Sequence, residues 1–65
     1  MKYFDSINCV RNAGLQIEPI LEREINFALA NGDKLALKDG WLAIVSPKGE
    51  LVKNLQMYGN IVVDE

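Results

Sequence analysis

The chain is 65 residues long, 49% apolar, and carries a formal net charge of −2, with a single cysteine and no histidine. This length supports one domain over residues 1–65, and the cysteine and histidine counts exclude an internal disulfide and a Cys/His zinc site. The charge gives no general attraction to nucleic acid or to an anionic membrane. The longest purely apolar run, Trp41–Val45, is far shorter than the roughly 20 residues of a membrane helix.

Helical spacing of apolar residues occupies the first half of the chain. A short helix is predicted from about Ser6 to Ala13, with Asp5 or Ser6 as its N-cap and Gly14 at its end. Phe4, just before the cap, is predicted to pack back onto the first turns as a hydrophobic staple. The inward-facing residues of this helix are predicted to be Ile7, Cys9 and Val10.

The clearest helix is predicted from about Pro19 to Asn31. Proline suits the first helical position because its missing N–H is not needed there. Gly32 follows the last apolar residue and offers the left-handed conformation that commonly closes a helix. Spacing of i, i+3, i+4 predicts one apolar stripe on this helix, made of Ile17, Ile20, Leu21, Ile25, Ala28 and Leu29.

After Gly32 the apolar spacing approaches two, which predicts a β-meander. Its strands are predicted at Lys34–Lys38, at Trp41–Val45 and from Leu51 to about Leu55, with a further strand at Asn60–Val63. Asp39-Gly40 is a two-residue hairpin turn, and Pro47-Lys48-Gly49 has the composition of a three-residue loop. The predicted fold class is α+β: two N-terminal helices packed on a three- or four-stranded antiparallel sheet.

The turns fix the register, and the register decides which side chains share a face. Lys38 is predicted opposite Trp41. The Pro47-Lys48-Gly49 loop predicts Val45 opposite Leu51, Ile44 opposite Val52 and Trp41 also opposite Leu55. One face is then predicted to carry Leu35, Leu37, Leu42, Ile44 and Val52. The other is predicted to carry Trp41, Ala43, Val45, Leu51 and Leu55, bordered by Lys34, Lys38 and Lys53.

Two short helices cover one face of a small sheet but not both. The face with Trp41 is therefore predicted to meet the C-terminal segment, a second copy of the chain or another protein, since a contiguous apolar patch is unusual on a monomer. In the alternative interpretation, the first helix covers this face, or Trp41 is a core residue of the monomer, because large aromatic side chains are highly buried on average.

The residue types give little support for catalysis. Without histidine or threonine, Ser-His and Cys-His relays are out of reach. Ser6 is interpreted as a helix cap, Ser46 as a turn residue and Cys9 as a buried thiol. Glu18 and Glu22 have i, i+4 spacing that could present oxygens to a cation, but a solvated helix start is the preferred interpretation. We predict that the chain is not an enzyme and uses no cofactor or metal.

A core this small is usually supported by disulfides, a metal or a partner subunit. With disulfides and a Cys/His metal site excluded, efficient packing or a partner subunit remains. We therefore predict a cytoplasmic protein-interaction module, a small regulator, adaptor or inhibitor, that binds another protein or itself as a homodimer. The lone thiol and the absence of a signal-like apolar stretch at the N-terminus favour the cytoplasm.

Two alternatives stay open. One is weak binding of single-stranded nucleic acid by Trp41 and its surrounding lysines. The other is an enzyme subunit that contributes Glu18 and Glu22 to a composite site.

Overall fold

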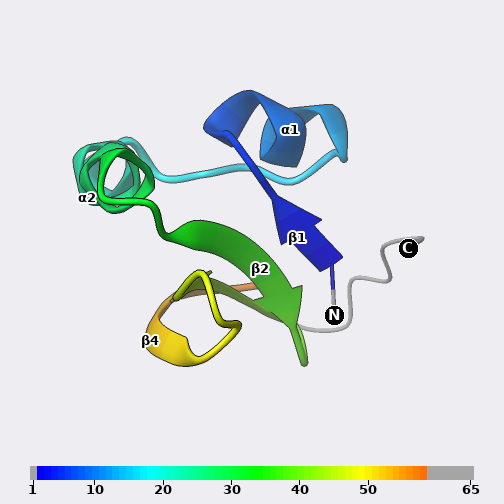
Figure 1. The fold of residues 1–65 in the computed structure, drawn as a ribbon. Coiled ribbons are helices and arrows are strands. Elements are labelled where there is room, and N and C mark those ends of the chain that lie inside the picture. The colour runs from blue at the N-terminus through cyan, green and yellow to red at the C-terminus, as the bar shows by residue number, and fades with distance from the viewer. Residues whose placement is uncertain (1, 59–65) are drawn as a thin grey trace.

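A computed structural model describes residues 2–58 of the chain. The fold is α+β, and its elements follow in the order β1, α1, α2, β2, β3, β4 (Figure 1). The four strands form one antiparallel sheet in the order β1-β2-β3-β4. Both helices lie on the same side of this sheet, so its two faces have different surroundings (Figure 1). The element bounds are β1 Lys2–Phe4, α1 Ile7–Asn12, α2 Pro19–Ala30, β2 Lys34–Lys38, β3 Trp41–Val45 and β4 Leu51–Met57.

Both predicted helices are confirmed, with ends set by the expected residues. The Ser6 side chain accepts the N–H of Cys9 at the start of α1, and Pro19 is the first residue of α2. At the other end of α2, Gly32 adopts a φ of +93° and Asp33 donates its N–H to the Ala28 carbonyl. This is the glycine-closed helix end that satisfies the last carbonyl groups of a helix.

The β2–β3 hairpin has the register that its turn predicts. Lys38 pairs with Trp41, and the pairing continues without a register shift to Lys34 and Val45. Asp39 and Gly40 have φ values of +53° and +82°, as the two central residues of a type I′ turn require. Asparagine, aspartate and glycine tolerate this left-handed region best, so the dipeptide itself determines the connection.

One strand was not predicted. Lys2–Phe4 forms β1, which pairs antiparallel with β2 and places Phe4 opposite Leu35. Phe4, predicted to pack onto the first turns of the first helix, lies in this strand and is buried in the core that also contains Val10 of α1. The other predicted strand, Asn60–Val63, lies outside the described residues.

The hydrophobic core lies between the helices and the sheet. Its sheet side includes Phe4 and four of the five residues predicted to share one face, namely Leu35, Leu37, Leu42 and Ile44. The fifth, Val52, is exposed. Val10 of α1 and Ile25 of α2 are fully buried against them.

Two helix residues predicted to face inward do not. Ile20 is 81% exposed and Cys9 is also exposed. Each of these helices is too short or too peripheral to bury its whole apolar stripe, so the edge positions of the stripe reach solvent.

Candidate interaction face

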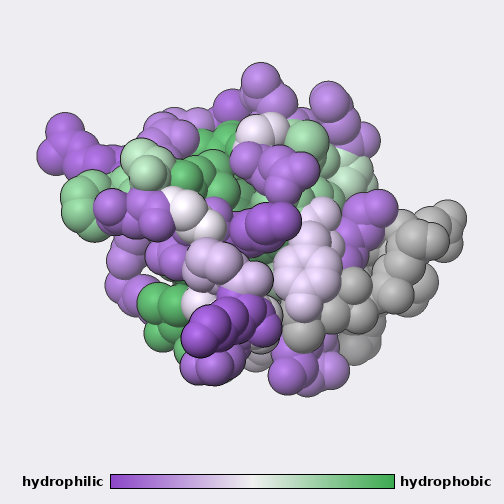
Figure 2. Space-filling model, viewed as in Figure 1, coloured by the Kyte–Doolittle hydropathy of each residue, from purple (hydrophilic) through white to green (hydrophobic). Residues whose placement is uncertain are grey.

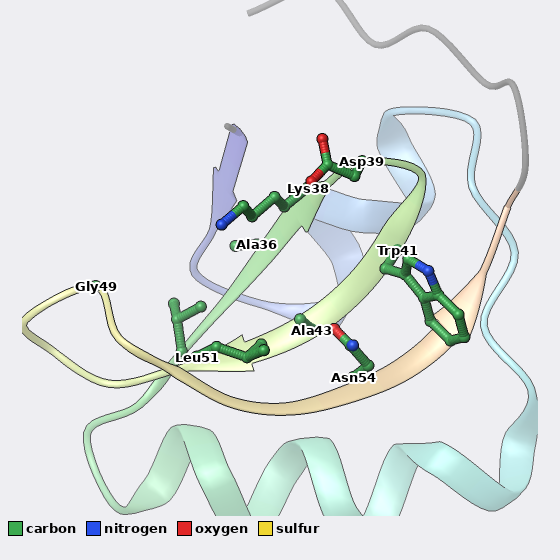
Figure 3. Close-up of a pocket in the computed structure, with 9 residues that line it drawn as sticks. Ala36, Lys38, Asp39, Trp41, Ala43, Gly49, Leu51 and Asn54 are labelled. Carbon is green, nitrogen blue, oxygen red and sulfur yellow. The ribbon is translucent and has the colours of Figure 1, made fainter.

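The sheet face opposite the helices is the candidate site, and we call it the Trp41 face. Strand pairing places three rows of side chains across it: Lys34, Val45 and Leu51; Tyr3, Ala36, Ala43 and Asn54; and Lys38, Trp41 and Met57. No helix or strand within residues 2–58 lies over this face, because both helices pack on the other side (Figures 1 and 3).

The centre of the Trp41 face is made of small buried residues, and larger side chains surround them. Ala36, Ala43 and Val45 are at most 3% exposed, whereas Trp41 is 37% and Leu51 58% exposed. The difference in side-chain size leaves a hollow of about 190 Å³ above the two alanines. We call it the apolar hollow.

Figure 3 shows how the apolar hollow is bounded. Trp41 lies at one end and Leu51 with Gly49 at the other, while Lys38 and Asp39 border one side and Asn54 the opposite side. The polar side chains of the lining are thus one lysine, one aspartate and one asparagine. An aliphatic side chain placed here would contact methyl groups and the indole ring, with hydrogen-bonding groups only at the margin.

A second hollow lies beside the first. It is lined by Tyr3, Lys34, Ser46, Pro47, Lys48 and Gly49 and has a volume of about 300 Å³. We call it the lysine hollow, because two of its lining residues are lysines and none is acidic. Gly49 lines both hollows, so they are neighbours on the surface.

Most residues predicted for this face lie on it. Trp41, Ala43, Val45 and Leu51 line the apolar hollow together with Lys38, and Lys34 lines the lysine hollow. Their predicted role in binding stays a prediction, since their position alone does not test it.

Two predicted residues lie elsewhere. Leu55 was placed opposite Trp41, but Met57 has that position and Leu55 packs against the hydrophobic core. Lys53 was placed at the border of the Trp41 face, but its Nζ lies 2.6 Å from the Glu24 carboxylate of α2, on the helix side.

Two register shifts between β3 and β4 explain both corrections. One lies between Leu42 and Ala43, and the other lies between Ile44 and Val45. Each inserts one additional β4 residue, as a β-bulge does, and so changes which side chains point to which face. Lys53 therefore pairs with Ile44, the position predicted for Val52, and Val52 itself is 57% exposed.

Four residues of the Trp41 face were not predicted: Tyr3, Ala36, Asn54 and Met57. Tyr3 is 50% exposed and its hydroxyl lies near Gly49, at the boundary of the two hollows. Asn54 and Met57 reach the face through the two bulges. Only Ala36 had a signal in the sequence, because it alternates with Leu35 and Leu37 on a predicted strand and lies opposite Ala43 in the predicted hairpin register.

The exposed surface has a second group of apolar side chains on α2. Ile20 and Phe27, seven positions apart on this helix, are 81% and 72% exposed. The side of the molecule viewed in Figure 2 is mostly hydrophilic, with apolar areas around the position of α2 and where β4 begins in Figure 1. Leu51 and Val52 are the exposed apolar residues at that end of the strand.

The ion pairs recorded within residues 2–58 belong to the helix side. Arg11 of α1 pairs with Glu22 of α2, and Lys53 pairs with Glu24. Glu22, considered above as a cation ligand, thus has a cationic partner. In the described part of the chain, no three Cys, Asp or Glu residues gather as a metal site would need, and no helix there has the length and apolar character to cross a membrane.

The end of β4 is fixed to the connection between the helices. The Tyr58 hydroxyl donates to the Gln16 carbonyl over 2.5 Å, and the Tyr58 N–H donates to the Gly40 carbonyl over 2.7 Å. The Gln56 side chain accepts the N–H of Glu18 and donates to the Gln16 carbonyl. These bonds hold Met57 and Trp41 at one end of the face.

Alkaline pH is expected to reduce the stability that the Tyr58 hydrogen bond to the Gln16 carbonyl contributes. Burial raises the pKa of the Tyr58 phenol above its ordinary value of 10.0. The unfolded chain then loses this proton at lower pH than the folded chain, so the contribution to stability is complete below about pH 10 and is lost as the pH rises through the folded-state pKa.

We expect Tyr58→Phe to remove this part of the pH dependence and to cost about 1 kcal/mol at neutral pH through the lost hydrogen bond. Urea unfolding of both chains from about pH 7 to about pH 11 measures the two effects. The same alkaline slope in both chains would show that Tyr58 contributes nothing to it.

No protein-family model, curated protein or solved structure matches the chain.

Proposed function

We propose that this domain is a protein-interaction module that binds its partner through the Trp41 face. The observation that carries the proposal is the apolar hollow, a buried alanine floor beside a partly exposed tryptophan, on a sheet face that no element of residues 2–58 covers. Tryptophan and tyrosine are enriched among the residues that dominate binding energy, and such residues favour pockets at the centre of an interface.

The lining chemistry favours binding over catalysis. Lys38, Asp39 and Asn54 provide its polar groups, and the lining has no hydroxyl or thiol nucleophile. The hollow is also open to solvent and bordered by exposed side chains, whereas general acid–base catalysis needs a positioned group in a shaped, water-excluding site. We therefore regard the domain as a non-enzymatic regulator, adaptor or inhibitor, whose partner is another protein or a second copy of the chain.

Site-specific photo-crosslinking tests the proposal. A benzophenone amino acid would replace Leu51 on the Trp41 face or, as the control, Phe27 on α2; both positions are well exposed, at 58% and 72%. After irradiation in the cells from which the chain derives, we expect covalent adducts from position 51 and few from position 27. The adduct mass separates a homodimer from another protein. Adducts from position 27 alone would place the interface on α2 and contradict the proposal.

Single-stranded nucleic acid is the second candidate, and one observation favours it. Tyr3 adds another exposed aromatic ring to the face that carries Trp41, Lys34 and Lys38. Aromatic side chains and lysines on a sheet are the elements of a single-strand binding platform. Salt-dependent quenching of Trp41 fluorescence by a thymidine oligonucleotide would support this candidate, and no quenching at low salt would remove it.

A further inference from the structure

The two hollows differ in the charge they favour, and this difference identifies the kind of partner. The apolar hollow has aliphatic and aromatic walls with Lys38 and Asp39 at its border, whereas the lysine hollow has Lys34 and Lys48 and no carboxylate in its lining. The Tyr3 and Ser46 side chains add hydroxyl groups to the lysine hollow. Together the hollows are lined by three lysines and one aspartate, although the whole chain is negative at −2.

A second copy of the chain fits this surface poorly. A two-fold interface brings the same patch of each subunit together, so the lysine-rich border of one copy would face that of the other. Like charges placed opposite one another oppose association and discriminate against such a partner. The surface charge instead favours an acidic partner.

Nucleic acid also fits less well than an acidic protein segment. The linings contain no arginine, the residue that forks onto phosphates and bases. The floor of Ala36, Ala43 and Val45 lies below the surrounding side chains. Such a recess accepts one aliphatic side chain better than it supports a row of stacked bases, which need exposed ring faces.

Strand geometry gives the approximate separation of the apolar hollow and the lysine hollow. Ala43 lies on the floor of the apolar hollow, and Ser46, three residues further along the chain, lines the lysine hollow. Extended chains advance about 3.3 Å per residue, so two or three residues of an extended ligand span the same separation.

We propose that the Trp41 face binds an extended segment of another protein, with an apolar side chain in the apolar hollow and an Asp or Glu side chain, two or three positions away, in the lysine hollow. This inference rests on the proposed function and names the partner chemistry for the same face. The carboxylate forms charge-assisted contacts with Lys34 and Lys48, and the apolar side chain contacts Trp41 and Leu51.

Selection from a random-peptide display library tests the proposal directly. The full chain is the bait, and peptides that also bind Trp41→Lys are discarded. We expect the retained peptides to share an apolar residue with Asp or Glu two or three positions from it. Retained peptides with an apolar residue but no acidic preference would overturn the partner chemistry while leaving the proposed function in place.

Matched lysine variants then locate the acidic contact. Titration of a selected peptide, followed by Trp41 fluorescence, is expected to show at least tenfold weaker binding to the Lys34→Gln/Lys48→Gln chain. The Lys2→Gln/Lys53→Gln chain, which removes the same number of charges at residues on the helix side of the sheet, is expected to bind as the native chain does. Equal weakening of peptide binding by both variants would show that net charge alone accounts for the loss. It would overturn the assignment of the acidic contact to the lysine hollow.

The other occupants give separate results. Self-association of the native chain that Trp41→Lys abolishes, measured by sedimentation over a concentration series, would identify a second copy as the occupant. Tighter binding of the thymidine oligonucleotide than of any selected peptide would identify nucleic acid. Either result overturns the acidic-segment proposal, and the second also overturns the proposed function.

Discussion

Replacing Trp41 with lysine is expected to abolish partner binding and to leave the domain folded. The indole ring is 37% exposed and lies at the end of the Trp41 face, outside the core between the helices and the sheet. Loss of an aromatic residue that dominates the binding energy of an interface typically costs about 2 kcal/mol or more, which corresponds to about 30-fold weaker binding. The loss is measured as the decrease in adducts formed from the benzophenone at position 51.

The matched control for this variant is Phe27→Lys on α2. Phe27 is more exposed than Trp41, at 72%, so the control adds the same charge at an aromatic position outside the Trp41 face. We expect its binding and its unfolding midpoint to stay close to those of the native chain. If Trp41→Lys unfolds the protein while Phe27→Lys does not, Trp41 belongs to the core and the proposed interface is wrong.

Leu42→Ala is expected to give the largest loss of stability. Leu42 is fully buried in the centre of the core, on the helix side of β3. Truncation of a buried leucine to alanine costs about 2–5 kcal/mol, and a domain of this size has few kcal/mol in reserve. Each 1 kcal/mol lowers the melting temperature of a small domain by roughly 4–8 °C.

Thermal unfolding followed by circular dichroism measures this effect, with Leu51→Ala as the control. Leu51 is 58% exposed on the Trp41 face, so its truncation is expected to cost less than about 1 kcal/mol. Comparable losses from the two variants would mean that the Trp41 face is as important to folding as the core.

The parts of the fold that the sequence predicted are those with strong local determinants. Asp39-Gly40 requires positive φ angles and so sets a type I′ turn, which fixes the pairing of Lys38 with Trp41. Pro19 and Gly32 fix the ends of α2 in the same local way. The pairing of Val45 with Leu51 was likewise predicted from its loop.

The parts that were missed depend on distant contacts. β1 has three residues, too few for a periodic pattern. It forms a strand because its backbone pairs with the otherwise unpaired edge of β2. The bulges in β4 carry no proline or glycine to mark them.

The bulges also limited the prediction of the site. A single inserted residue moves a side chain to the opposite face, and this change removed Leu55 and Lys53 from the Trp41 face. The residues of β2 and β3 kept their places because no bulge lies between those strands.

Trp41 is the only tryptophan of the chain, so tryptophan fluorescence reports on the Trp41 face alone. Acrylamide quenching of that fluorescence therefore tests most directly whether the Trp41 face is accessible in the monomer. Under conditions in which sedimentation shows a monomer, we expect quenching intermediate between that of a free indole and that of a buried one, in keeping with the 37% exposure. Quenching should decrease when a partner or selected peptide is added. A monomer whose tryptophan is inaccessible to acrylamide would contradict the account, because its Trp41 face would already be covered.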